Sequence, residues 1–182
     1  GDAFGFRMLT ATDLHIIFPA ATGENIDKFW RPLNDVMDEF NINSAVRQAA
    51  FLAQIGHESG SLRYVRELAS GEAYEGRADL GNTEPGDGIK FKGRGLIQVT
   101  GRNWYERAES ELGIDCVEHP ELLEEPINAC RVSGWWWSVN KCNDLADQND
   151  IRKVTKKVNG GLNGLADRIA IWDRAKDVFG LS

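Results

Sequence analysis

The sequence predicts one mainly α-helical domain over residues 1–182, and three observations support this prediction. Apolar residues recur at intervals of three and four along two long stretches, as expected for helices that bury one face. Strand-like alternation is confined to one short run, and no repeat or low-complexity linker divides the chain. A hydrophobic content of 42% in 182 residues is also enough to bury a substantial core.

Three helices are expected in the first third of the chain. Thr10 or Thr12 caps a short helix that Pro19 ends. The second helix covers residues 25–40, where large apolar residues at helical spacing indicate a core-facing side. The third helix follows Ser44, a favourable N-cap residue, and its apolar face consists of small residues that allow close packing.

The chain then becomes irregular before it becomes helical again. Residues 70–92 are rich in glycine and charge, and we expect an irregular flap or a small β element that lines a cleft. Further helices are expected at residues 102–112, 126–139, 150–157 and 164–178, separated by Gly113, Pro120, Pro126 and the segment around Asn159. Trp135, Trp136 and Trp137 point about 100° apart on such a helix, which favours core packing over a sugar-binding platform.

The segment 51–60 places an acidic residue where a helix meets glycine. Glu58 follows the apolar helical run directly, with His57 before it and Gly60 shortly after. A carboxyl group at such a helix end is partly removed from water, which suits it to donate a proton near neutral pH. The ordinary alternative is a solvated glutamate at a helix terminus.

The segment 92–101 predicts a tight loop with polar groups on one side. Glycines bracket Arg94, and the alternation of a short β-type run turns Gln98 and Thr100 to the same face. A glycine-rich hairpin with a buried glutamine is the structural alternative. The spacing matches neither a dinucleotide-binding nor a phosphate-binding loop.

Together these segments resemble glycoside hydrolase family 19, whose members include chitinases and the lysozyme-like endolysins of bacteriophages. The resemblance rests on three motifs in the family's order: His57-Glu58-Ser59, Gly93–Thr100 and Val158–Gly161. It implies a lysozyme-like or chitinase-like helical domain. The compact spacing and the stretch Glu75–Gly88 are more similar to the phage endolysin branch, so peptidoglycan is favoured over chitin as the substrate.

The family's chemistry implies inverting hydrolysis of a β-1,4 glycosidic bond by two carboxyl groups. By resemblance, Glu58 is the general acid and Glu67 the general base. On one unbroken helix these residues would be about 13 Å apart along the axis, whereas inverting carboxyl groups are roughly 6.5–9.5 Å apart. We therefore predict a bend at Ser59-Gly60-Ser61, and Glu72 and Glu75 remain alternative bases.

The resemblance also implies the residues that support the reaction. Thr100 matches the family's hydroxyl residue that helps to hold the attacking water. Residues expected to contact the substrate are His57, Gln98, Tyr105, Asn159 and Arg168. For Arg168, pairing with a catalytic carboxylate and an ordinary surface ion pair are both open. Turn or capping roles are the alternatives for Thr100, Gln98 and Asn159.

Charge and composition exclude several classes of partner. The net charge of −7 argues against a nucleic-acid-binding protein, so a glycan would be held by hydrogen bonds and stacking. Lys90, Lys92, Arg94 and Arg102 form either a basic strip facing wall carboxylates or a solvated rim. No apolar run approaches the roughly 18 residues of a membrane span.

The remaining expectations concern thiols, metals and location. Three cysteines in an odd pattern suggest reduced thiols with Cys130 in the core, and the scattered histidines indicate no metal site. We expect that the protein requires no cofactor and that it is a monomer. The N-terminus lacks a signal pattern, so the protein is expected to be made in the host bacterial cytoplasm and to act on the periplasmic wall.

Three alternative functions stay open. Chitinase activity would use the same catalytic residues. A lytic transglycosylase is suggested by the similarity of Glu58-Ser59 and Gly95–Gln98 to that class, and it would need one acid and yield an anhydro sugar. A non-catalytic glycan-binding module or a lysin inhibitor would show binding without turnover.

Overall fold

The computed structural model describes residues 7–181, which form nine α-helices and three 3-10 helices. The α-helices are α1 (Ala11–Ile17), α2 (Gly23–Glu39), α3 (Ala45–Glu58), α4 (Asp87–Lys90), α5 (Arg102–Leu112), α6 (Pro126–Val139), α7 (Cys142–Asp147), α8 (Ile151–Asn159) and α9 (Leu165–Val178), and the 3-10 helices are η1 (Glu72–Tyr74), η2 (Ala78–Leu80) and η3 (Pro120–Glu124). Residues 1–6 lie outside this range. They include part of the N-terminal segment in which no signal pattern was expected. The prediction of a mainly α-helical fold is confirmed.

Local sequence signals account for most helix boundaries. Thr10, not Thr12, caps α1, since its side chain accepts a hydrogen bond from the Asp13 backbone N–H. Helix α2 begins earlier than predicted because Thr22 caps it. Helix α7 was not predicted: it has only 6 residues, too few to display a helical period, and follows Lys141 at a positive φ of 58°.

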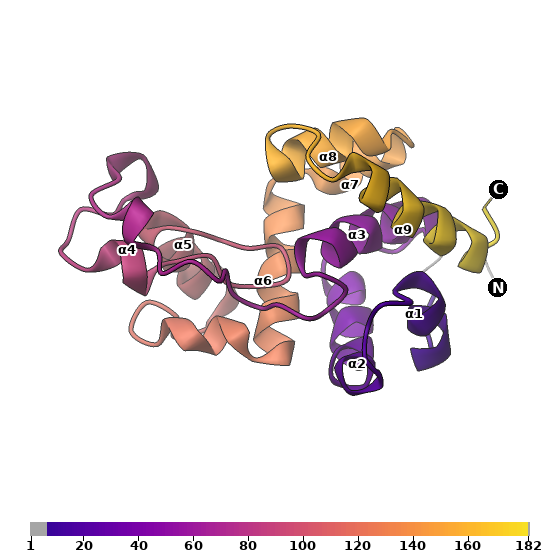
Figure 1. Cartoon of the computed structure of the whole chain (residues 1–182), viewed down its shortest axis with the longest axis horizontal. Helices are drawn as coiled ribbons and strands as arrows, with labels where there is room; N and C mark the ends of the chain where they lie inside the picture. The colour runs from indigo at the N-terminus through magenta and orange to yellow at the C-terminus, as the bar shows by residue number, and fades with distance from the viewer. Residues whose placement is uncertain (1–6, 182) are drawn as a thin grey trace.

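Helix α6 stands between two groups of elements (Figure 1). Helices α1–α3 and α7–α9 pack on one side of it, and α4, α5 and the flap lie on the other. These groups are two lobes, the larger one being that of α1–α3 and α7–α9. Each lobe has its own buried hydrophobic cluster, to which α6 contributes Trp137 and Trp135 respectively. Trp136 packs against both clusters, so the prediction that this tryptophan run packs in the core is confirmed.

Helix α3 is buried along most of its length and carries Glu58 as its last residue. Its N-cap is Ser44, as predicted. At Gly56, an added Cβ would lie 2.6 Å from the Phe18 ring and 2.9 Å from Ile171 of α9. Small residues therefore let α9 lie directly against α3, and this close approach brings the start of α9 to the end of α3.

The chain bends sharply where α3 ends. Gly60, Ser61 and Leu62 have positive φ angles of 58°, 59° and 69°, and a left-handed residue other than glycine costs roughly 1–2 kcal/mol. The bend is held because Ser59 Oγ accepts the Leu62 N–H at 2.9 Å and the Leu62 side chain is only 1% exposed. The predicted bend after Glu58 is therefore present and turns the chain towards the flap.

The flap, residues 70–92, is irregular and is held by polar contacts. Asp87 is 2% exposed and accepts two hydrogen bonds from Arg102, each of 2.8 Å. These bonds hold the pKa of Asp87 below its usual range. Asn82 is also buried and joins the flap to the start of α5 by accepting the Arg102 backbone N–H. The flap is thus held in a defined conformation by polar contacts with the start of α5.

Neither alternative for the basic cluster, a strip facing wall carboxylates or a solvated rim, holds for Arg94 and Arg102. Arg94 is 9% exposed and bonds to Glu124, the Lys90 carbonyl oxygen and the Tyr105 hydroxyl. Arg102 is occupied by the flap carboxylates. The prediction is wrong for these two arginines because each satisfies a buried or half-buried acid within its own lobe.

The structure also bears on membranes and thiols. Among the described helices, none is long and apolar enough to cross a membrane. Cys116, Cys130 and Cys142 are free and buried, and burial raises the pKa of the Cys116 thiol to about 11. These are properties of unreactive core thiols, in agreement with the expected reduced state.

We expect Gly56→Ala to lower the free energy of unfolding by about 1–3 kcal/mol, because the methyl group would overlap the Phe18 ring. Gly23→Ala is the control: it lies at the start of α2 with nothing within 4 Å, so stability should stay constant or rise by up to ~1 kcal/mol. Denaturant unfolding followed by circular dichroism measures both. A Gly56→Ala protein as stable as the wild type would contradict the close α3–α9 packing.

Candidate active site

Glu58 is held from one side by a buried arginine. Its Oε1 accepts a hydrogen bond of 2.6 Å from Nη2 of Arg168, which lies in the second turn of α9. The Arg168 side chain is 1% exposed and that of Glu58 is 27% exposed. The carboxyl group therefore has one oxygen fixed by a cation inside the protein while the group as a whole still reaches solvent.

The loop after α8 supplies a further contact to this arginine. Asn159 Oδ1 accepts the Asn163 N–H at 3.2 Å, and the Asn163 carbonyl oxygen accepts a bond of 3.1 Å from Arg168 Nε. The Asn159-Gly-Gly segment thus shapes a loop that holds Arg168. Burial of Arg168 makes the prediction of a direct substrate contact wrong, whereas pairing with Glu58 is what the structure contains.

His57 makes a parallel contact beside this pair. Its Nδ1 lies 2.8 Å from Oδ2 of Asp167, the residue before Arg168. Gly164, at φ 72°, lies so close that a Cβ there would overlap the imidazole ring. The end of α3 and the start of α9 are therefore joined by two adjacent pairs, and His57 remains partly exposed at the surface.

Glu67 is held by neutral donors on both of its oxygens. Its Oε1 accepts the Gly93 N–H at 2.5 Å, and its Oε2 accepts the Tyr74 hydroxyl at 3.0 Å. The Glu67 N–H in turn donates to the Gly93 carbonyl oxygen at 2.9 Å. Isolated β-bridges of Arg94 with Arg66 and with Val99 fix the surrounding backbone. Both oxygens of this carboxyl group therefore have a hydrogen-bond donor that fixes their position.

Gly93 is the point at which three of the predicted site residues meet. A Cβ on Gly93 would lie 2.7 Å from Gln98 Oε1 and 3.2 Å from both Glu67 Oε1 and Thr100 Oγ1. Gln98 and Thr100 thus face the same place, as the period-two alternation predicted. A Cβ there would crowd the carboxylate, the amide and the hydroxyl that converge on this point.

Tyr105 does not belong to an exposed site, so the prediction that it contacts substrate is wrong. It is 0% exposed, its hydroxyl donates to the Lys92 carbonyl oxygen, and the same hydroxyl accepts a bond from Arg94. Burial also raises its pKa. Tyr105 instead stabilises the backbone next to Gly93, and the sequence pattern alone does not distinguish these roles.

The alternative bases have other surroundings. Both carboxylate oxygens of Glu75 accept flap backbone N–H groups, from Gly86 at 2.9 Å and Gly88 at 2.8 Å. These two bonds lower the pKa of Glu75 and tie it to the flap. Glu72 is exposed in η1. Of the three glutamates, Glu67 is the one whose carboxylate meets Thr100 and Gln98.

Sequence reasoning missed three residues of this region. Asp167 gave no signal because its partner His57 is 110 residues away. Tyr74 gave none because it lies in an irregular segment, where no period relates it to Glu67. Gln54 contacts Arg168 and precedes Glu58 by one helical turn. That spacing places both on one side of α3, and it was a usable signal.

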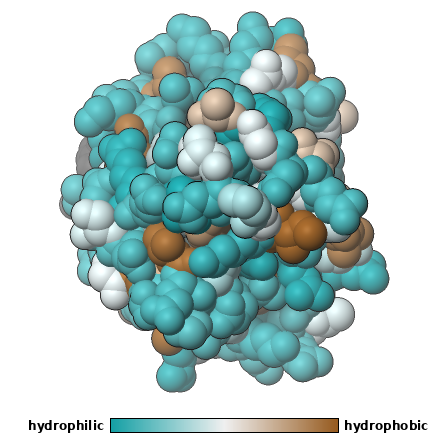
Figure 2. All heavy atoms as spheres, turned by 90° about the vertical axis from the view of Figure 1, so that its left-hand side faces the viewer, coloured by the Kyte–Doolittle hydropathy of each residue, from teal (hydrophilic) through white to brown (hydrophobic). Residues whose placement is uncertain are grey.

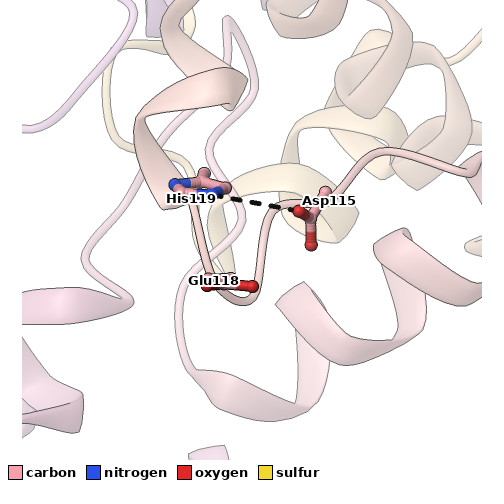
Figure 3. Close-up of side chains that lie close together, drawn as sticks. All are labelled: Asp115, Glu118 and His119. Carbon is pink, nitrogen blue, oxygen red and sulfur yellow. Dashed lines mark ion pairs between the residues drawn. The ribbon is translucent and has the colours of Figure 1, made fainter.

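One group of possible metal ligands occurs in the described residues, in the loop between α5 and η3. Asp115, Glu118 and His119 have ligand atoms within 4.8 Å of one another (Figure 3). His119 is therefore less isolated than the sequence suggested. All three are exposed, and nothing else at this place indicates a ligand, so we assign no metal site to it.

Comparison with known proteins finds relatives among glycoside hydrolase family 19 proteins and chitinases. No family model matches the chain. A Haemophilus influenzae protein described as a glycosyl hydrolase family 19 domain-containing protein is 29% identical over 196 aligned residues, which cover 91% of this chain and 94% of that protein. An Arabidopsis thaliana endochitinase is 35% identical over 114 residues, which cover 62% of this chain but only 38% of the plant protein.

Solved structures agree with these relatives in fold. Chitinase C from Streptomyces griseus superposes with a TM-score of 0.78 at 22% identity, over 100% of this chain and 80% of that one. A second bacterial family 19 chitinase gives a TM-score of 0.79 at 21% identity, over 97% of each chain. The fold is that of these bacterial chitinases. The homologues and structural neighbours of this chain are glycoside hydrolase family 19 proteins, among them chitinases.

We expect Tyr74→Phe to lower kcat about ten-fold with little change in KM, because a hydrogen bond to a carboxylate contributes roughly 1.5–3 kcal/mol. Burial and the bond to Glu67 raise the pKa of Tyr74 above its usual 10.0. The Tyr74 hydroxyl therefore remains a donor as pH rises, and the difference in kcat between the wild type and Tyr74→Phe should persist until the pH reaches this raised pKa. Steady-state rates on a β-1,4 glycan measure it.

Tyr64→Phe is the matched control, since the Tyr64 ring packs on Gly60 and lies beside Arg63. It should keep the wild-type kcat. Equal losses in both variants, or none in Tyr74→Phe, would count against a role for Tyr74 in holding Glu67.

Proposed function

We propose that the chain is an endolysin that hydrolyses the β-1,4 bond between N-acetylmuramic acid and N-acetylglucosamine in peptidoglycan, with inversion. The observation that carries this proposal is the pair of glutamates in contrasting surroundings. Glu58 accepts from a buried guanidinium, whereas Glu67 accepts from two neutral donors next to Thr100. An inverting glycosidase needs two such carboxyl groups with different tasks.

In the proposed mechanism, protonated Glu58 gives its proton to the glycosidic oxygen. The bond from that oxygen to the anomeric carbon breaks, and the oxygen keeps the electron pair. Glu67 removes a proton from a water molecule, whose oxygen attacks the anomeric carbon from the opposite face. Thr100 orients this water, and Gly93 and Tyr74 keep the accepting carboxylate in place. The Arg168 guanidinium stabilises the negative charge that Glu58 acquires.

Substrate binding is assigned to the polar groups around these acids. Gln98 reaches the same place as Glu67 and Thr100 and is suited to bond a sugar hydroxyl. His57 is partly exposed beside Glu58. Asn159 is half-buried, and its oxygen already orders its own loop. We therefore assign Asn159 an indirect part in binding through that loop.

Peptidoglycan is preferred because the flap is short and its sequence is similar to that of the phage branch. Chitin is the second candidate, favoured by relatives such as the endochitinases of Arabidopsis thaliana and Beta vulgaris. A lytic transglycosylase would not require Glu67, yet both oxygens of this residue are held in place.

We further propose that the protein is a cofactor-independent monomer, made in the bacterial cytoplasm and acting on the periplasmic wall. The face at the flap end is mainly hydrophilic with scattered apolar residues (Figure 2). The exposed large apolar side chains are spread over separate elements: Met8, Ile16, Leu68, Ile89 and Ile127. Such a surface and the net charge of −7 favour recognition of a glycan by hydrogen bonds.

Product analysis tests the function. Wild type, Glu58→Gln and Glu67→Gln are incubated with purified peptidoglycan and, in parallel, with chitin oligomers, and products are identified by mass spectrometry. We expect reducing, hydrated muropeptides from the wild type and a loss of at least about a thousand-fold in each variant, because each removes a proton-transfer group.

Other outcomes would identify other functions. Anhydro products, or full activity without Glu67, would indicate a lytic transglycosylase. Turnover of chitin alone would indicate a chitinase. Binding without turnover by the wild type would refute catalysis altogether. Circular dichroism of both glutamine variants checks that they remain folded.

A further inference from the structure

A chain of buried polar side chains runs from Glu58 into the interior of the larger lobe. Arg168 Nη1 donates to Gln54 Oε1 at 2.5 Å, and Gln54 Nε2 donates to Thr155 Oγ1 at 3.1 Å. Gln54 and Thr155 are 0% exposed and Arg168 is 1% exposed. This series of hydrogen bonds joins α3, α9 and α8. Arg168, Gln54 and Thr155 are all buried away from solvent.

The direction of these hydrogen bonds follows from chemistry. A guanidinium only donates, so the Gln54 oxygen has to face Arg168. The Gln54 amide nitrogen then has to face Thr155, whose hydroxyl oxygen accepts. Thr155 therefore orients Gln54, and Gln54 presents an acceptor to Arg168 in a fixed place.

The charges explain why a neutral acceptor is needed. Among the described residues, Glu58 is the only carboxylate within ion-pair distance of Arg168. When Glu58 carries the proton that it must donate, the buried guanidinium loses its anionic partner. An unpaired buried charge is strongly unfavourable. Gln54 Oε1 and the Asn163 carbonyl oxygen still accept from it in that state.

We propose that Gln54, oriented by Thr155, is a positioning residue for the proton donor. It keeps the Arg168 guanidinium in one place whether Glu58 is protonated or ionised, so that the carboxyl group can lose its proton without a rearrangement of its partner. This inference rests on the proposed role of Glu58 as the general acid. Gln54 itself touches no reacting atom.

The charged groups near Glu58 make the proposal testable by pH. Arg168 and Asp167 face the end of α3 from α9, His57 precedes Glu58 on α3 itself, and the contact from α8 is the neutral Thr155. Gln54→Glu would give Arg168 a second carboxylate. Because added negative charge opposes the ionisation of Glu58, the high-pH limb of kcat/KM should move to higher pH.

The experiment compares Gln54→Leu, Gln54→Glu and Thr155→Val with Gln48→Leu in the full chain. Gln48 is a matched control, since it is also 0% exposed on α3 but bonds to the Arg7 carbonyl oxygen and to Met37. Rates are measured from pH 4 to pH 9 on any β-1,4 glycan that the wild type cleaves, alongside thermal unfolding.

We expect Gln54→Leu to lower kcat by about ten- to hundred-fold with a much smaller effect on KM, since small displacements of a catalytic group have large effects. Thr155→Val should have a weaker effect of the same kind. Gln48→Leu should lose stability but keep kcat. Gln54→Glu should shift the high-pH limb upward by about half a unit or more.

Two results would overturn the inference: equal kcat values for Gln54→Leu and Gln48→Leu, or an unshifted pH profile for folded Gln54→Glu. If Gln54→Leu does not fold, Gln54→Glu and Thr155→Val decide. Glu58→Gln separates this failure from failure of the proposed function. If Glu58→Gln is active, Glu58 is not the general acid and the proposed function fails. If Glu58→Gln is inactive but the Gln54 variants behave as the wild type, only the positioning role of Gln54 fails.

Discussion

The ion pair between Arg168 and Glu58 is the constraint on which the candidate site depends. It joins the last residue of α3 to the start of α9; its arginine is buried, whereas its glutamate still reaches solvent. A buried guanidinium has to be satisfied on all sides, and this need recruits Gln54 within α3 and the Asn163 carbonyl oxygen after α8. The first sequence motif is linked to the third through this side chain and Asn163.

The second glutamate, Glu67, is held by hydrogen bonds from neutral groups and, among the described residues, not by an ion pair. Glu67 accepts from the Gly93 N–H and the Tyr74 hydroxyl, both neutral. Its position depends on the left-handed bend after Glu58 and on the irregular flap, which belongs to the other hydrophobic cluster. The two acids are therefore supported by separate lobes, and α6, which packs in both clusters, is the structural link between those lobes.

Particular residues show how far sequence reasoning reaches. Ser44 as a cap, the bend at Ser59–Ser61 and the shared face of Gln98 and Thr100 were predictable because each depends on neighbours in the chain. Tyr105 and the basic strip were misread. A tyrosine or an arginine is equally suited to a surface or to a buried hydrogen-bond network, and only its distant partners decide between them.

The sequence by itself determined the helical class, most helix boundaries and the motifs that indicate family 19, because periodicity, caps and glycines act over a few residues. Only the tertiary structure decided which groups hold each carboxylate. Arg168 is 110 residues from Glu58 and Gly93 is 26 residues from Glu67. Contacts between residues so far apart in the chain form only when the helices pack and the flap forms its own polar network. The same packing buries polar groups, and a buried polar group needs a hydrogen-bond partner.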